Sequence, residues 1–335
     1  MINVVINGFG RIGRSFLRTV LLDSATRNKI KITAINIGPG RPDFVAHMFK
    51  YDTLMGTYPG DVKMQGNSLV VDGYAIEVIA ETDPTNINWR TYKVDWVVES
   101  SGKFTKRAGA EQHIKSGAQY VLITAPAEGE DVAIIPGVNL EKFDKSKDKI
   151  VSLGSCTTNA FIPMLRVLQD AFEIKQGFMT TIHAYTNSQV LLDVEDKSLR
   201  MSRAAALNII PTTTGASKML TKVMPELDGL VPAMALRVPV GKCSLIDLNV
   251  VTGTQDLTKQ QVNDAFIKAA KTSMPGILGI TVEELVSSDF SGTNYSVVID
   301  GLLTQAQGNM VKVFGWYDNE WGYSERLKDF LMFVA

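Results

Sequence analysis

Cysteine is scarce in this chain, with only Cys156 and Cys243 among 335 residues. Two cysteines cannot form a disulfide framework for a chain of this length, so the sequence favours a reducing compartment. The three histidines, His47, His113 and His183, show no spacing typical of metal ligands. We therefore predict neither a disulfide-stabilised fold nor a metal site.

Long apolar runs and an excess of charge are also missing. No run approaches the roughly 18 residues that a membrane-spanning helix needs, and residues 1–8 lack the basic and apolar segments of a signal peptide. Lys and Arg total 34 and Asp and Glu total 35, so the net charge of −1 gives no bulk attraction to nucleic acid or anionic membrane. The sequence predicts a cytoplasmic protein whose partners are small molecules, and any anion binding must be local.

A glycine turn follows the first strand-like run, residues 2–7. Gly8, Gly10 and Gly13 fit the pattern G-x-G-x-x-G, and apolar residues at helical spacing begin at Ile12. In this pattern the first glycine allows a tight turn, the second lets backbone approach a pyrophosphate, and the third lets the helix pack closely on its strand. Because free N–H groups at the start of a helix bind phosphates, the turn indicates a dinucleotide-binding site.

The next strand-like run leaves the choice between NAD and NADP open. It ends at Ile37, where an acidic residue usually accepts hydrogen bonds from the adenosine ribose. The Ile37 side chain accepts no hydrogen bond, and the nearby Arg41 is suited to a 2′-phosphate. Both cofactors therefore stay candidates.

A polar turn surrounds Cys156. Residues 151–153 are apolar, residues 155–159 are polar, and apolar residues then recur at helical spacing from Phe161. The pattern predicts that Cys156 lies at a helix N-terminus, where N–H groups and the helix dipole favour a nucleophilic thiolate near neutral pH. Cys243 has no such surroundings, and we expect it to pack in the core.

His183 is the candidate base. It stands where the strand-like run 175–183 ends in a polar loop, a position suited to an acid or base beside a thiolate. His47 and His113 lie within helical patterns with no nucleophile nearby in the sequence. We expect structural or surface roles for these two.

Length and patterning predict an α/β protein of about two domains. Over residues 1–154 strands alternate with helices, which predicts a Rossmann-type dinucleotide-binding domain with a parallel sheet. Over residues 155–316 the strands are longer and helical patterns fewer, at 258–272 and 282–285, which predicts an α+β catalytic domain with a mixed or antiparallel sheet. Residues 317–335 are amphipathic and are predicted to form a C-terminal helix that returns to the first domain.

Taken together, these motifs closely resemble those of the phosphorylating glyceraldehyde-3-phosphate dehydrogenases, including the sister erythrose-4-phosphate dehydrogenases. The resemblance runs in family order from one end of the chain to the other. The matching segments are residues 7–14 (NGFGRIGR), 50–52 (KYD), 155–159 (SCTTN), 208–216 (NIIPTTTGA), 236–239 (LRVP) and 316–323 (WYDNEWGY).

The resemblance implies a reversible oxidation of glyceraldehyde 3-phosphate to 1,3-bisphosphoglycerate, as in glycolysis or gluconeogenesis, by a cytoplasmic homotetramer. Cys156 would form a thiohemiacetal and then a thioester that inorganic phosphate cleaves. His183 would serve as the acid/base and help to hold the oxyanion. Thr186 and Arg237 would bind the substrate phosphate. The attacking phosphate would bind at Ser155, Thr157, Thr214 and Gly215.

The same resemblance implies which residues bind NAD or NADP. Asn319 would hydrogen-bond the nicotinamide carboxamide and so select the ring face. The full set of cofactor residues would be Gly8, Gly10, Arg11, Ile12, Gly13, Ile37, Thr124, Asn319 and Tyr323.

Several positions depart from the family pattern. Ile37 replaces the ribose-binding Asp, Ala160 stands where a second Cys commonly follows, and Ser188 replaces an Asp near the substrate-phosphate site. Glu195 lies in a segment that approaches a neighbour's cofactor in family tetramers. An acid there would oppose a 2′-phosphate, which conflicts with the inference from Ile37.

Other functions are consistent with the same residues. Erythrose 4-phosphate is the alternative substrate within this chemistry. A thiol hydrolase or acyltransferase would use Cys156 and His183 alone and would need no glycine-turn cofactor. A nucleotide-binding regulatory module would have a silent site, and its activity would survive loss of Cys156.

Overall fold

The computed structural model describes residues 1–335 and divides the chain into two compact units. Unit 1 comprises Met1–Ile134, Leu140–Gly154 and Ser324–Ala335, and unit 2 comprises Ile135–Asn139 and Ser155–Tyr323. The sequence-based boundary at residue 154 coincides with one junction between the units. The short segment Ile135–Asn139 lies before this boundary but belongs to unit 2. Gly137 packs there so closely that a Cβ on it would lie only 3.1 Å from the Ile277 side chain.

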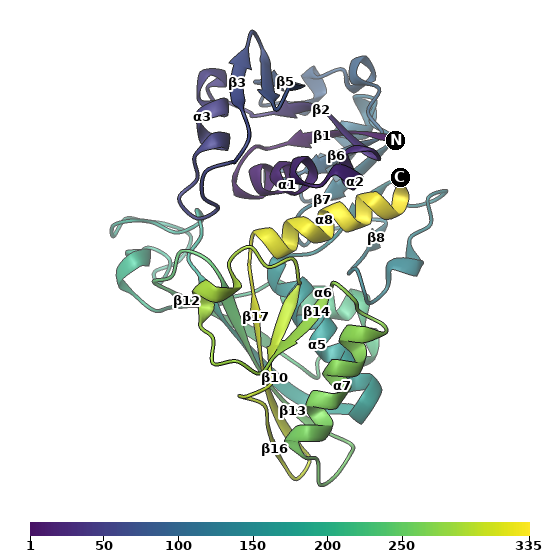
Figure 1. The fold of residues 1–335 in the computed structure, drawn as a ribbon, viewed down its shortest axis with the longest axis vertical. Helices are drawn as coiled ribbons and strands as arrows, with labels where there is room; N and C mark the ends of the chain where they lie inside the picture. The colour runs from purple at the N-terminus through teal and green to yellow at the C-terminus, as the bar shows by residue number, and fades with distance from the viewer. The chain divides into compact units, whose positions relative to one another are not determined.

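Unit 1 contains a nine-stranded, mostly parallel sheet, so the predicted Rossmann-type α/β fold is confirmed (Figure 1). The spatial order is β3-β4-β5-β2-β1-β6-β7-β9-β8, and only the β3-β4-β5 hairpins are antiparallel. The strands are β1 (Ile2–Asn7), β2 (Ile30–Asn36), β3 (Val62–Gln65), β4 (Ser68–Val71), β5 (Tyr74–Ile79), β6 (Trp96–Glu99), β7 (Tyr120–Ile123), β8 (Val132–Ala133) and β9 (Ile150–Ser152).

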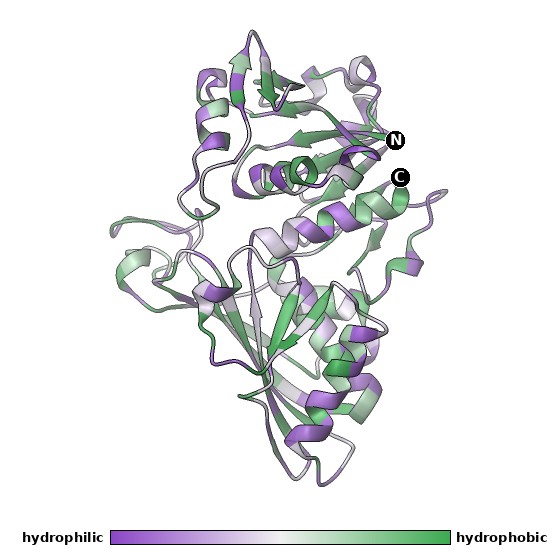
Figure 2. Ribbon diagram, viewed as in Figure 1, coloured by the Kyte–Doolittle hydropathy of each residue, from purple (hydrophilic) through white to green (hydrophobic).

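The connections of unit 1 are short helices. The α-helices are α1 (Arg11–Leu22), α2 (Ser24–Arg27), α3 (Val45–Lys50) and α4 (Arg107–Lys115). The 3₁₀ turns are η1 (Pro42–Phe44), η2 (Pro84–Asn86), η3 (Trp89–Tyr92) and η4 (Leu140–Lys142). The strands between them are the apolar part of the unit (Figure 2), and β1, β6 and β7 are almost fully buried, as expected for a parallel sheet covered on both faces.

The last helix, α8 (Trp321–Val334), packs its C-terminal part within unit 1. The Phe330 ring lies edge-on to Trp96 at 5.4 Å, and Trp96 stacks on Tyr120 at 4.6 Å. The helix begins at Trp321 rather than at residue 317, because Tyr317 ends a strand and the Asp318 carboxylate accepts hydrogen bonds from the N–H groups of residues 320 and 321. A capping carboxylate of this kind defines a helix start.

Unit 2 contains an eight-stranded mixed sheet, as predicted. The spatial order is β11-β12-β10-β13-β17-β15-β14, with β16 paired to β17, and the parallel pairs are β10–β12 and β14–β15. The strands are β10 (Ile174–Ala184), β11 (Ile210–Thr213), β12 (Ala233–Val238), β13 (Ser244–Thr252), β14 (Leu278–Thr281), β15 (Val297–Asp300), β16 (Gln305–Gln307) and β17 (Met310–Tyr317).

Unit 2 has three α-helices: α5 and α7 contact strands of this sheet (Figure 1), and α6 packs against α5. They are α5 (Cys156–Phe172), α6 (Ala216–Val223) and α7 (Lys259–Lys271), and the 3₁₀ turns are η5 (Ala205–Leu207), η6 (Pro225–Leu227) and η7 (Ser287–Phe290). The predicted helix over 282–285 is wrong: these residues are irregular. Val282 and Val286 are 68% and 61% exposed, so this apolar spacing forms no buried helical face.

No helix in the structure is both long enough and apolar enough to cross a membrane.

Candidate active site

Cys156 is the first residue of α5, so its predicted place at a helix N-terminus is confirmed. The preceding Ser155 caps the helix: its hydroxyl accepts a hydrogen bond from the Thr158 N–H at 3.2 Å, and the Thr158 hydroxyl accepts one from the Ser155 N–H at 3.3 Å. This reciprocal capping box fixes where the helix starts. Cys156 is partly buried, whereas Cys243 is buried in a small apolar cluster with Phe290 and Val298.

His183 lies at the end of β10 beside that cysteine. Its Nε2 atom is 3.6 Å from the Cys156 Sγ, within hydrogen-bond reach of a sulfur. The side chain is buried, with 3% of the residue exposed. The structure therefore joins the two residues that the sequence selected separately, which lie 27 positions apart.

Arg237 occupies the other side of the imidazole. It faces His183 directly across the parallel β10–β12 pair. Its Nη1 atom lies 2.6 Å from His183 Nδ1 and donates a hydrogen bond to the Ala184 carbonyl at 3.1 Å, and Nδ1 is also 2.6 Å from that carbonyl. No carboxylate pairs with Arg237, so its positive charge faces the site.

These neighbours shift both protonation equilibria. Burial first and the Arg237 charge second lower the pKa of His183 to about 3. Burial raises the pKa of the Cys156 thiol, although the Arg237 charge and hydrogen bonds at Thr157 oppose that rise. The direction for Cys156 is opposite to the one expected from its helix position alone, because desolvation of the thiolate outweighs the helix terminus.

Tyr317 connects three elements beneath the pair, a role that the sequence analysis missed. Its buried hydroxyl bonds to the Thr157 hydroxyl at 2.9 Å and to the Thr181 hydroxyl at 2.8 Å. Burial raises the pKa of Tyr317 well above its ordinary range, so the phenol stays neutral. The Tyr-Asp-Asn-Glu-Trp-Gly run marked this residue, but only the strand β17 shows that it points at the start of α5.

The predicted phosphate-binding residues do not all turn toward the pair. The Thr157 hydroxyl points to Tyr317, and the Thr186 hydroxyl bonds to the Ser188 hydroxyl at 2.9 Å. Thr214 accepts a hydrogen bond from the Ala216 N–H at 3.3 Å, and Gly215 precedes α6 with no side-chain cap on that helix. Neither Thr214 nor Gly215 hydrogen-bonds to the cysteine–histidine pair.

In unit 1, the three glycines of the turn meet three different spatial demands. Gly8 has φ +96°, and a Cβ there would lie 2.4 Å from the Ser101 nitrogen. A Cβ on Gly13 would lie 2.3 Å from the Gly8 carbonyl oxygen, whereas a Cβ on Gly10 would meet nothing within 4 Å. No side chain caps α1, so its first N–H groups face this open space, and the turn fits a bound pyrophosphate.

The remaining predicted cofactor residues lie in both units. In unit 1, Arg11 pairs with Asp52, Ile12 is half-buried in α1, Ile37 follows β2, and Thr124 follows β7. In unit 2, the Asn319 side-chain oxygen accepts a hydrogen bond from the Cys243 N–H at 3.0 Å, and Tyr323 is buried in α8. Arg41, the cation that the sequence analysis considered for a 2′-phosphate, is held by Asp43. Its guanidinium lies 4.2 Å from the centre of the Phe44 ring.

A buried polar network lies at the carboxyl edge of the unit 1 sheet. The Glu99 carboxylate accepts hydrogen bonds from the Asn7 amide, from the N–H and hydroxyl of Ser101, and from His113 Nε2 at 2.9 Å. Trp89 donates to His113 Nδ1, so the ring hydrogen must be on Nε2. His113 therefore has the structural role that we expected, and the network holds the loop beside Gly8.

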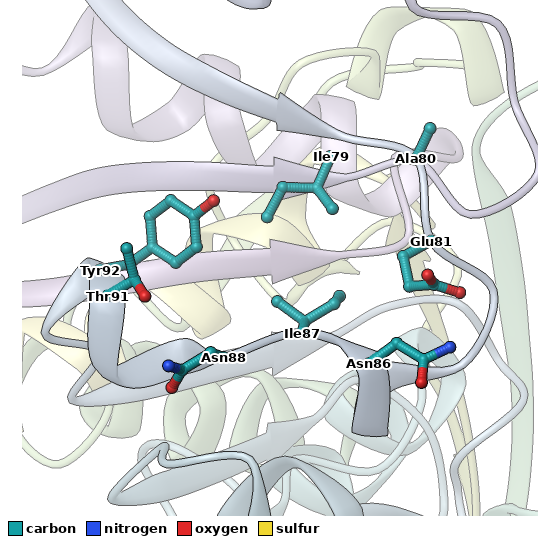
Figure 3. Close-up of a pocket in the computed structure, with 8 residues that line it drawn as sticks. All are labelled: Ile79, Ala80, Glu81, Asn86, Ile87, Asn88, Thr91 and Tyr92. Carbon is teal, nitrogen blue, oxygen red and sulfur yellow. The ribbon is translucent and has the colours of Figure 1, made fainter.

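One cavity of unit 1 contains none of the predicted site residues. It has a volume of about 300 Å³ and lies between the end of β5 and the turns η2 and η3 (Figure 3). Ile79, Ile87 and Tyr92 line its apolar part, and Asn86 and Asn88 lie at its rim. Its titratable lining residues are Glu81 and Tyr92, and neither Cys156 nor His183 lines it, so it is no candidate for the chemistry of Cys156.

A dinucleotide-binding sheet, together with a second sheet that carries a cysteine beside a histidine, is typical of an NAD(P)-dependent dehydrogenase. Two family models match the chain: the NAD binding domain of glyceraldehyde 3-phosphate dehydrogenase over residues 2–107, and the C-terminal domain of the same enzyme over residues 155–319. The chain therefore belongs to the glyceraldehyde-3-phosphate dehydrogenase family, and the predicted resemblance is confirmed.

Full-length relatives agree with this assignment. The chain is 48% identical to glyceraldehyde-3-phosphate dehydrogenase 2 of Streptomyces avermitilis over 335 residues, which cover 100% of this chain and 98% of the relative. It is 47% identical to glyceraldehyde-3-phosphate dehydrogenase 2 of Bacillus subtilis, with 100% and 97% covered. It is 45% identical to glyceraldehyde-3-phosphate dehydrogenase of Geobacillus stearothermophilus, with 100% and 98% covered.

Proposed function

We propose that this protein oxidises glyceraldehyde 3-phosphate to 1,3-bisphosphoglycerate with NAD and inorganic phosphate, with Cys156 as nucleophile and His183 as acid/base. The observation that carries the proposal is the 3.6 Å approach of Cys156 Sγ to His183 Nε2 in a chain of this family. A buried thiol beside an imidazole is the arrangement that covalent catalysis at a carbonyl carbon needs.

The first chemical step forms a carbon–sulfur bond. The Cys156 proton passes to His183 Nε2, the thiolate attacks the aldehyde carbon, and the carbonyl oxygen becomes an oxyanion that the Nε2–H group stabilises. Bound NAD supplies a hydride acceptor for this carbon. Loss of the hydride leaves a thioester on Cys156, which stores the energy of the oxidation.

The second step is phosphorolysis. A phosphate oxygen attacks the thioester carbon, a carbon–oxygen bond forms, and the carbon–sulfur bond breaks. The departing thiolate recovers the proton held on His183, so the site returns to its starting state. Positive charge at Arg237 favours phosphate groups on this side of the imidazole, since the guanidinium has no acidic partner.

The proposed binding roles follow the same logic. The Arg237 guanidinium and the Thr186 hydroxyl would hold the substrate phosphate, and Ser155, Thr214 and Gly215 would bind the attacking phosphate with hydroxyl and N–H donors. The Thr157 hydroxyl is bonded to Tyr317, so we assign its contribution to backbone N–H at the start of α5. The cofactor contacts of Asn319 and Tyr323 stay predictions.

Unit 1 serves as the dinucleotide-binding domain of this proposal and unit 2 as its catalytic domain. Gly8, Gly10 and Gly13 would let the pyrophosphate approach the first N–H groups of α1. NAD is the preferred cofactor in this proposal. Arg41 is held by Asp43, and this acid opposes a 2′-phosphate.

A homotetramer is the assembly that we propose, and exposed apolar side chains support an interface. In unit 2, Leu191, Leu192 and Leu199 are 84%, 75% and 92% exposed, and on β10 Phe178 is 71% exposed. Such a concentration of exposed apolar residues is typical of an interaction surface. Light scattering of the purified protein will test the assembly, and cell fractionation will test the predicted cytoplasmic location.

The central experiment follows the absorbance of reduced cofactor with glyceraldehyde 3-phosphate, with and without inorganic phosphate. Cys156→Ser should lower kcat by about four orders of magnitude or more, as for loss of a covalent nucleophile. Cys243→Ala is the matched control, because the Cys243 side chain packs with Phe290 and Val298 rather than against His183, and it should retain turnover. Turnover without phosphate would contradict phosphorolysis, and ester hydrolysis without NAD would favour a thiol hydrolase.

The substrate needs a separate comparison. We expect a higher kcat/KM for glyceraldehyde 3-phosphate than for erythrose 4-phosphate. The reverse order would reassign the protein to the erythrose 4-phosphate reaction while leaving the roles of Cys156 and His183 unchanged.

A further inference from the structure

A short loop follows β2 at the position where the adenosine ribose is expected. In dinucleotide-binding folds an acid at the end of this strand hydrogen-bonds the ribose 2′-hydroxyl, and an Arg nearby can instead accommodate a 2′-phosphate. Here Ile37 follows β2, and a Cβ on Gly40 would lie only 3.2 Å from the Ile37 carbonyl oxygen. The loop therefore turns back on Ile37, and the next residue along the chain is Arg41.

The turn η1 holds the Arg41 guanidinium against Asp43 and Phe44. Pro42 fixes the backbone φ between the two charged residues, and the Phe44 N–H donates to the Arg41 carbonyl at 3.1 Å. The Arg41 Nε atom donates to Asp43 Oδ1 at 3.2 Å, and Nη2 donates to Oδ2 at 2.6 Å. The centre of the Phe44 ring lies 4.2 Å from the Arg41 Cζ atom. One edge of the guanidinium and one of its faces are therefore already occupied.

The occupied edge is one that a phosphate would use. Two parallel hydrogen bonds from such an edge are the favourable geometry in which Arg binds a carboxylate or a phosphate. The hydrogen bond from Arg41 lowers the pKa of Asp43, so this carboxylate is charged at neutral pH. A 2′-phosphate at Arg41 would have to displace the carboxylate or lie beside it, where the like charges repel. The uncharged 2′-hydroxyl of NAD meets no such repulsion.

We propose that Asp43, by occupying Arg41, is the residue that makes this chain prefer NAD to NADP. The Ile37 side chain offers no polar group to either ribose, so the discrimination depends on this ion pair. The inference rests on the proposed function and deepens it, because it assigns the choice of cofactor to a named acid. The chain accordingly contains a 2′-phosphate site whose cation is neutralised by its own neighbour.

Exposure limits the size of this effect. The Arg41 and Asp43 side chains are 68% and 58% exposed, and ion pairs at such exposure are weak and screened by salt. Coulomb repulsion between a carboxylate and a phosphate dianion in these water-like surroundings corresponds to about tenfold in affinity. We therefore expect a shift of that order in the cofactor preference, rather than complete exclusion of NADP.

Calorimetric titration of the whole protein with NAD and with NADP, in the absence of aldehyde, measures the preference without turnover. We expect the wild type to bind NAD more tightly. Asp43→Asn should raise the affinity for NADP about tenfold and leave that for NAD nearly unchanged, and added KCl should reduce the gain. Tighter binding of NADP by the wild type, or an unchanged ratio of the two affinities in Asp43→Asn, would overturn the proposal.

Two further variants show whether the gain depends on Arg41. Adding Arg41→Gln to Asp43→Asn should abolish the gain in NADP affinity, and a gain that survives would contradict the proposal, since Asp43 would then act through its charge alone. Asp61→Asn is the matched control, because Asp61 is exposed and pairs with Lys63 two positions away. It should leave the ratio of affinities unchanged, and an effect equal to that of Asp43→Asn would also contradict the proposal.

These titrations separate the inference from the proposed function. A protein that shows the expected affinities but does not oxidise glyceraldehyde 3-phosphate would support the inference and remove the proposed function. An active dehydrogenase with the same ratio of affinities in the wild type and in Asp43→Asn would do the reverse.

Discussion

At the residue scale, the Cys156 thiol is subject to opposing influences. The helix start and the Arg237 charge favour the thiolate, and burial favours the thiol and raises its pKa. His183 is similarly disfavoured as a cation, since burial and Arg237 lower its pKa to about 3. Burial therefore works against the charged form of both residues of the pair.

The low pKa of His183 predicts how stability depends on pH. Between about pH 6.5 and pH 3 the unfolded chain binds a proton at this residue and the folded chain does not, so the free energy of unfolding falls as the pH falls. His183→Asn should remove about 1.4 kcal/mol per pH unit of that dependence. Urea unfolding at several pH values will measure it, and identical slopes for both proteins would contradict the buried neutral ring.

Ile37 is the residue on which the expected choice between NAD and NADP depends. It follows the last residue of β2 and its side chain has no hydrogen-bond acceptor, and the nearby Arg41 is held by Asp43. In the proposed cofactor site, this position therefore supplies neither a carboxylate that would select NAD nor an unpaired cation that would select NADP.

Introducing that carboxylate should sharpen the cofactor preference. Ile37→Asp should raise the ratio of kcat/KM for NAD over NADP by about tenfold or more, because the acid accepts hydrogen bonds from the ribose and repels a 2′-phosphate. Ile37→Leu is the control and should leave the ratio unchanged. An unchanged ratio in Ile37→Asp would mean that the adenosine ribose lies elsewhere.

At the scale of elements, the glycines in the turn between β1 and α1 differ in the space around them. Gly8 needs a positive φ and has no room for a Cβ, whereas Gly10 has open space above it. The same motif thus contains two glycines, Gly8 and Gly13, that have no room for a Cβ, and one, Gly10, that has room and is needed only in the proposed cofactor site.

A pair of alanine substitutions should show this division. Gly8→Ala should lower the free energy of unfolding by several kcal/mol, because its Cβ would overlap the Ser101 backbone and its φ is strained. Gly10→Ala should change the free energy of unfolding by less than about 1 kcal/mol yet weaken NAD binding at least tenfold. Denaturant titration measures the free energy of unfolding and calorimetric titration measures NAD binding. Equal losses of stability in Gly8→Ala and Gly10→Ala would contradict this division of roles.

Elements with a strong local pattern were predictable from the sequence. The alternating strands of unit 1 and the helix that begins at Cys156 follow from apolar spacing and polar turns. The structure of residues 282–285 was not predictable, because so few apolar residues at helical spacing also occur in irregular surface segments. The start of α8 depends on the Asp318 cap, and the sequence alone placed it four residues too early.

The sequence was enough to select the residues of the candidate site, but not to predict their pKa shifts or their contacts. Cys156 and His183 could be selected from their local surroundings. The burial that reverses the expected pKa shift of Cys156 depends on tertiary packing, as does the contact of Arg237 with Nδ1. The same is true of Tyr317, whose partners Thr157 and Thr181 are more than 130 residues away in sequence.

At the scale of the whole molecule, the exposed leucines of unit 2 allow the proposed tetramer to be tested. Substitution of both Leu191 and Leu192 by Glu should shift the protein from tetramer toward smaller species, because desolvating charged side chains at an interface is costly. Light scattering measures the mass, and Lys197→Glu, a charge change in the same segment, is the control. A tetramer that survives the double substitution would place the interface elsewhere.

The Glu99 carboxylate has a consequence for motion in unit 1. Its oxygens accept hydrogen bonds from a strand, from a helix and from the loop beside the glycine turn, so none of these elements can move away alone without leaving a buried polar group short of partners. Amide hydrogens at this end of the sheet, including that of Ser101, should therefore exchange with deuterium only when the strands themselves separate. If the cofactor binds at this edge as proposed, we expect little loss of ordering entropy there on binding, because these groups are already held in place.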